Sequence, residues 1–152
     1  MTGRAALLLR AGLVLLTAIA AVQGGWMYLA PRSFYDNVPT VSDSGPFSQH
    51  LMSDVGGLNL AMAVVLGCAA VWLERRLARV ALAAYVVYSV FHLLFHLTRL
   101  TGLSAGGTAF LVTVLSLLSA LSLALLLLTA WPAEGFRVRH ADPADTRGRE
   151  AC

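Results

Sequence analysis

Three of the four histidines and one aspartate fall into two pairs with helical spacing. His50 precedes Asp54 by four residues, and His92 precedes His96 by four. Residues four apart lie on one face of an α-helix, about one turn from each other. Neutral imidazole and carboxylate are common ligands of transition metals, and imidazole also binds haem iron. The two pairs therefore predict a site for a transition metal, a haem or a small ligand.

Both pairs are expected at the same depth of one helical hairpin. A cluster of arginines beginning at Arg75 marks its turn, and Asp54 and His96 lie equally far from Arg75 in the sequence. If the two helices are neighbours, all four groups converge at the end opposite the turn. A haem would then need one histidine from each helix, because two histidines on one face cannot take opposite axial positions.

The second helix of this hairpin carries a polar stripe, which should face protein because polar groups at membrane depth cost several kcal/mol when they are unpaired. The stripe consists of Tyr85, Ser89, His92, His96 and Arg99. A structural interpretation competes with the ligand site: Arg99 pairs with Asp54, and the cluster is an interhelical staple. Gly56 and Gly57, next to Asp54, would let helix backbones approach closely. No catalytic nucleophile stands clearly beside a base and an orienting acid.

The elements that position these residues are membrane-spanning helices. Of the 152 residues 58% are hydrophobic and only 12% are charged, about half the charged share of a soluble domain, and the mean hydropathy is +0.73. Four apolar runs are each long enough to cross a bilayer. We predict an all-α, four-helix transmembrane domain over residues 1–132, with helices at about 5–29, 47–73, 78–98 and 108–131. Residues 133–152 have the composition of a disordered tail.

The first apolar run also admits a second interpretation, a cleaved signal peptide, because Arg4 and Arg10 precede its centre and it contains small residues around Ala20. The run continues to Leu29, however, which favours an uncleaved helix that spans the membrane.

All 11 basic residues are arginines, and they flank the apolar runs. Most lie near the N-terminus, around residues 75–79 and after residue 136, whereas only Arg32 and Arg99 fall at the opposite ends of the helices. The positive-inside rule then places both termini and the turn near Glu74 in the cytoplasm. The chain is predicted to be a multi-pass protein of the bacterial inner membrane that contacts lipid. The arginines form no stripe for nucleic acid.

The segment that follows the first helix, residues 31–39, mixes turn-forming and aromatic residues and is expected to form an ordered cap or an interfacial segment. Ser44, Gly45 and Pro46 then read as the start of the second helix, because serine caps free amides and proline is tolerated in the first turn.

Several short motifs resemble those of small uncharacterised actinobacterial membrane proteins related to the DoxX-like class. They are residues 31–35 after the first helix, 49–51 leading into 54–56, and Phe91 with His92 and His96. The likeness covers the first three helices best. It implies a four-helix membrane bundle and a redox association of some members, without an activity that transfers to these residues.

Two classes of function stay open at this point. One is a protein with a metal, haem or small-ligand site at His50, Asp54, His92 and His96, linked to membrane redox chemistry. The other is a non-catalytic scaffold or partner subunit, as a homo-oligomer or with another membrane protein. The sequence does not decide whether the protein is an enzyme.

Overall fold

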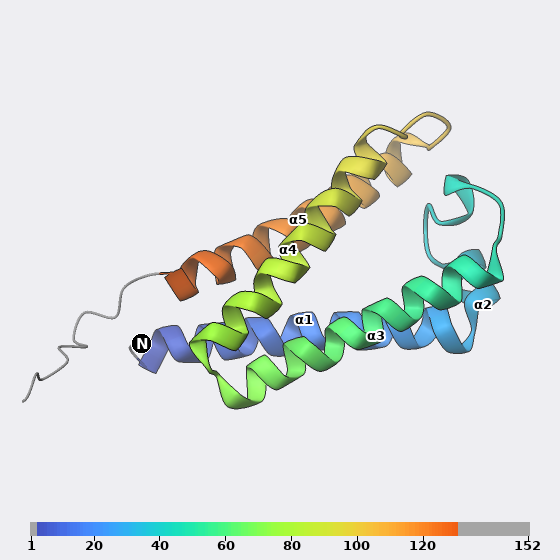
Figure 1. Ribbon diagram of the computed structural model, residues 1–152. Coiled ribbons are helices and arrows are strands. Elements are labelled where there is room, and N and C mark those ends of the chain that lie inside the picture. The colour runs from blue at the N-terminus through green and yellow to red at the C-terminus, as the bar shows by residue number, and fades with distance from the viewer. Residues whose placement is uncertain (1–2, 131–152) are drawn as a thin grey trace, which may run out of the picture.

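The computed structural model describes residues 3–130, which are almost entirely helical (Figure 1). The elements are α1 (Gly3–Leu29), α2 (Pro31–Asn37), the 3-10 turn η1 (Ser42–Ser44), α3 (Gln49–Trp72), α4 (Arg75–Leu97) and α5 (Ala105–Ala130). The predicted all-α fold with four long helices is confirmed, and the predicted bounds differ by only a few residues. The predicted tail, 133–152, lies outside the described residues.

The four long helices are long and apolar enough to cross a membrane. They contain 23 to 27 residues, which corresponds to roughly 35 to 40 Å at 1.5 Å per residue and exceeds a hydrocarbon core of about 30 Å. Large apolar side chains lie on their outer faces, for example Val71 at 70% and Phe91 at 68% exposure. Lipid can cover these faces, so the protein is a multi-pass membrane protein.

The long helices pack as two pairs, α1 with α3 and α4 with α5 (Figure 1). The pairs meet at one end of the molecule and diverge toward the other. We call the first the turn end, because it holds the start of α1, the α3–α4 turn and the end of α5. The other is the loop end, which holds α2, η1 and residues 98–104. The sequence predicted this relative placement of the helix ends; the side of the membrane that each end faces stays a prediction.

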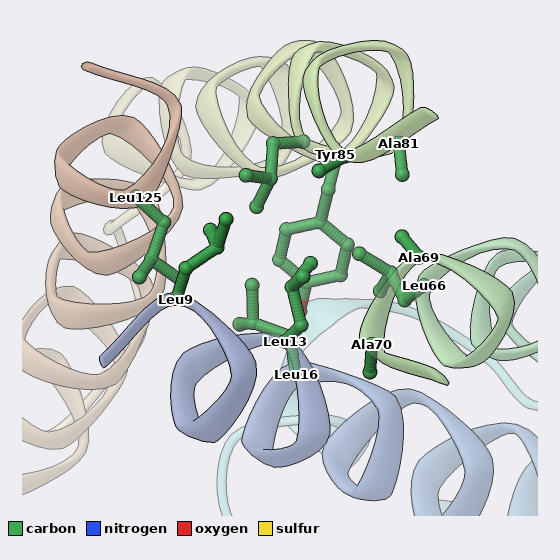
Figure 2. Packing of buried hydrophobic residues seen from close by; sticks show 11 residues of the cluster. Leu9, Leu13, Leu16, Leu66, Ala69, Ala70, Ala81, Tyr85 and Leu125 are labelled. Atoms are coloured by element: carbon green, nitrogen blue, oxygen red, sulfur yellow. The ribbon is translucent and has the colours of Figure 1, made fainter. Parts of the chain in front are cut away.

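Apolar side chains from all four long helices join the two pairs at the turn end (Figure 2). Leu9, Leu13 and Leu16 of α1 are fully buried there against Leu66 of α3 and Tyr85 of α4. Leu125 of α5 contacts the position where Gly12 would carry a Cβ. The core is therefore concentrated where the pairs meet.

Glycines set the distance between α1 and α3. A Cβ on Gly56 would lie 2.8 Å from the backbone nitrogen of Tyr28, so only glycine fits. The neighbouring Gly57 faces open space, with nothing within 4 Å of a Cβ. The expectation that glycines near Asp54 permit close backbone approach thus holds for Gly56 and not for Gly57.

The helix α3 begins later than the sequence indicated. Its N-cap is Ser48, whose Oγ accepts a hydrogen bond from the Leu51 amide at 3.3 Å. The predicted start at Ser44, Gly45 and Pro46 was wrong, because Ser44 belongs to η1. At the other end Leu73 closes α3 in a left-handed conformation with φ of 50°, and Glu74 directly precedes α4.

The segment after α1 forms an ordered cap over the loop end. The Tyr35 hydroxyl donates to the carbonyl oxygens of Gly45 at 2.7 Å and Ser42 at 3.3 Å, and its ring packs edge-on against Phe47. Arg32 donates from Nε to Asp36 Oδ2 at 2.8 Å, and this hydrogen bond and the attraction of the carboxylate raise the pKa of Arg32. The cap therefore ties α2 to the residues that lead into α3.

Candidate functional site

The first predicted pair, His50 and Asp54, lies at the start of α3. The Nε2 atom of His50 is 3.2 Å from Oδ2 of Asp54, so the spacing of four residues brings the two side chains together as expected. Both are exposed, with 88% and 63% of their side-chain surfaces accessible. An exposed pair of this kind is at most weakly stabilising, because solvent screens it.

The second pair, His92 and His96, lies in the last two turns of α4. The two rings contact each other edge-on with centroids 4.7 Å apart. Both side chains are half-buried, whereas Phe91 and Phe95 beside them are at least 50% exposed. The histidines therefore lie on the more protected face of α4.

The histidine pair continues a series of ring contacts that starts in the apolar core. Tyr85 is buried in the apolar core at the turn end (Figure 2), and its ring lies 5.9 Å from that of Tyr88. Tyr88 in turn stacks on His92, with centroids 5.7 Å apart and planes at 14°. We call Tyr85, Tyr88, His92 and His96 the ring series. It runs along one face of α4 from the core to the loop end.

The predicted polar stripe on α4 is largely confirmed. Tyr85 and Ser89 are buried, and the Ser89 hydroxyl lies 3.4 Å from that of Ser122 in α5. Arg99 departs from the expectation: it lies beyond the end of α4, is exposed, and places its guanidinium carbon 4.1 Å from the centroid of the Phe95 ring. Its contact is thus with an aromatic side chain of its own segment, and Asp54 pairs with His50 instead.

The structure does not assemble the two pairs into the single site that the sequence predicted. Within residues 3–130, no three His, Cys, Asp or Glu side chains are placed so that they could hold one metal ion. The reason is the pairing of the helices: α3 packs along α1 and α4 along α5, so the start of α3 and the end of α4 diverge (Figure 1). Nor do the pairs staple α3 to α4, since the contacts described for His50, Asp54, His92 and His96 stay within their own helices.

Sequence reasoning missed Tyr88, although its spacing contained the signal. Tyr88 precedes His92 by four residues, as His92 precedes His96, so the same helical rule places it on their face. Ser119 in α5 is one of the small hydroxyl residues that the sequence marks only for close helix packing, and its hydroxyl is buried without a hydrogen-bond partner. The polar groups between α4 and α5, which include Ser89, Ser122 and Ser119, thus extend from the two histidines toward the turn end.

Comparison with known proteins gives no relative from which a role for these residues could be taken. No family model, curated protein or solved structure matches the chain.

Proposed function

We propose that this membrane protein binds a small, lipid-soluble ligand at the loop end of α4, through Tyr88, His92 and His96. The observation that supports the proposal is the ring series, in which hydrogen-bonding rings follow one another from the core to the end of the helix. Ionisable side chains inside membrane segments are rare and costly, and they commonly mark functional sites. The ring contacts described for these two histidines lie within α4, so they do not tie it to α3.

The chemistry of the residues favours a planar ligand with oxygen acceptors, such as a quinone. A neutral imidazole has one N–H donor and one acceptor nitrogen, so His92 and His96 can each donate to a carbonyl oxygen. Aromatic rings such as that of Tyr88 stack against planar molecules. A quinone ligand would agree with the redox association that the resemblance to the DoxX-like class implies. We propose that the chain is related to this class.

A transition metal is the second candidate, because His92 and His96 offer two imidazoles within one turn of α4. Zinc sites usually have four ligands, three of them from protein even in catalytic sites. The remaining ligands would therefore have to come from another molecule, which makes the metal the less favoured candidate.

A binding titration tests the proposal on the purified full-length chain in detergent. Isothermal titration calorimetry with a short-chain ubiquinone should show saturable binding of about one molecule per chain. His92→Ala should weaken this binding at least tenfold, whereas His50→Ala, on another helix, should leave it unchanged. Equal binding to the wild type and to His92→Ala would refute the site. Metal analysis and an absorption spectrum of the same sample would show whether a metal or a haem is bound instead.

A further inference from the structure

A shallow groove lies between α4 and α5 at the turn end, and its lining on α4, from Arg79 to Ala83, precedes the ring series. Its volume is about 330 Å³, and it is open along one side. It is lined by Arg79, Val80 and Ala83 of α4 and by Leu126, Leu127, Thr129 and Ala130 of α5. Val80 and Leu127 are exposed by 66% and 60%. The groove is therefore apolar along most of its length and open to the surrounding lipid.

Positive charge gathers at one edge of this groove. Arg79 donates to the carbonyl oxygen of Thr129 from Nε at 3.2 Å and from Nη2 at 2.7 Å, and Nε of Arg75 donates to the same oxygen at 2.7 Å. Thr129 belongs to the last turn of α5, whose carbonyls lack partners within the helix and carry partial negative charge. These hydrogen bonds fix the guanidinium of Arg79 beside the groove.

The carbonyl of Thr129 carries no net charge, so its hydrogen bonds leave the positive charge of Arg79 in place. The described contacts between basic and acidic side chains join Arg32 to Asp36 and His50 to Asp54, and neither includes Arg79. Arg76 lies one turn before Val80 and is exposed. In addition, α4 begins at Arg75, so the free amides of its first turn add partial positive charge at the same level. The groove is therefore apolar and has a positively charged edge near the start of α4.

We propose that this groove binds an anionic phospholipid. One acyl chain lies along Val80, Ala83 and Leu127, and the phosphate group contacts Arg79 and Arg76. Basic pockets between transmembrane helices bind anionic lipid headgroups by the same combination of charge and apolar contact. Arginine suits the phosphate because its planar guanidinium can donate two parallel hydrogen bonds.

Binding of defined lipids to the purified full-length chain tests this proposal, with native mass spectrometry as the readout. Phosphatidylglycerol should bind at least several-fold more tightly than phosphatidylcholine with the same acyl chains. Glycerol phosphate, the headgroup without chains, should not bind at the same concentrations. Equal binding of the two phospholipids would overturn the proposal, and tight binding of glycerol phosphate would show a free anion site instead.

Two variants separate the contribution of charge from that of the groove. Arg79→Gln should weaken phosphatidylglycerol binding about fivefold, the factor that corresponds to about 1 kcal/mol for one arginine near an anionic surface. Ala83→Leu fills the groove and should weaken binding, whereas Ala84→Leu, at an exposed position outside the groove, should not. If Arg79→Gln loses helical circular dichroism, the two alanine variants decide alone. Identical binding by Ala83→Leu and Ala84→Leu would contradict the assigned groove.

Discussion

Gly24 of α1 and Gly56 of α3 lie backbone to backbone. A Cβ on Gly24 would be 2.8 Å from the carbonyl oxygen of Gly56 and 2.9 Å from the backbone nitrogen of Leu60. Both obstacles are backbone atoms, which cannot move aside as the end of a side chain can. Small residues commonly permit such close helix packing in membranes, where lipid gives little drive for helices to associate.

Gly24→Ala should therefore destabilise the protein. The added methyl group must push α1 and α3 apart, and overpacking of this kind costs about 1 to 3 kcal/mol. Thermal unfolding in detergent, followed by circular dichroism, should show a lower Tm. Gly25→Ala is the matched control, because a Cβ on Gly25 meets nothing within 4 Å. Equal Tm values for the two variants would exclude the close packing of α1 on α3.

Leu13→Ala should destabilise the junction of the two helix pairs. Leu13 is fully buried at the turn end, and truncating a buried leucine typically costs about 2 to 5 kcal/mol, part of it from the cavity that remains. Leu15→Ala removes the same atoms from a side chain that is 50% exposed and leaves no enclosed cavity. Chemical denaturation of both variants measures the difference, and a larger loss of stability for Leu15→Ala would contradict the position of the core.

Tyr35→Phe should loosen the cap without unfolding the helices. The change removes the hydroxyl that donates to Gly45 and Ser42, and a hydrogen bond of this kind contributes about 1 kcal/mol net. Hydrogen exchange measured by mass spectrometry should become faster in residues 38–48 and stay unchanged in α5. Tyr28→Phe serves as the control, since Tyr28 is 54% exposed. Unchanged exchange in the cap would show that the hydroxyl does not hold it.

The turn end should face the cytoplasm. This expectation rests on the arginines near the start of α1, at residues 75–79 and beyond α5. A fluorescent protein fused after Arg137 should fold and emit in the cytoplasm, and alkaline phosphatase inserted next to Asp43 should be active outside it. The opposite pattern of activities would reverse the orientation.

The long helices could be predicted from the sequence because a bilayer imposes a length and an apolar composition on each span. Contacts within one helix were equally accessible: the pairing of His50 with Asp54 and of His92 with His96 follows from the rise and twist of an α-helix alone. The predicted start of α3 was wrong because Ser44 and Ser48 are both acceptable N-cap residues. Only the folded conformation of the segment before α3 decides between them.

Whether His50 and Asp54 lie near His92 and His96 could not be decided from the sequence, since it depends on which helices pack together. Leucine and valine side chains can contact lipid as favourably as they contact another helix. The apolar composition of a span therefore does not indicate which helix it packs against. The partner of α3 is decided by the contact of Gly24 with Gly56, between residues far apart in the sequence. Glycine doublets are too common to identify such a contact without the structure.

The pairing of the helices also bears on how the ribosome and the membrane build this protein. Each pair joins two consecutive spans, and each contains polar contacts of its own, such as Arg10 with Val71 in the first pair and Arg79 with Thr129 in the second. The first pair is complete once α3 has been synthesised, before α4 leaves the ribosome. The second can then form by itself and dock on the first through apolar side chains such as Leu82 and Leu125, together with Tyr85. A chain translated in this order can complete these hydrogen bonds within each pair, without a partner from the other pair.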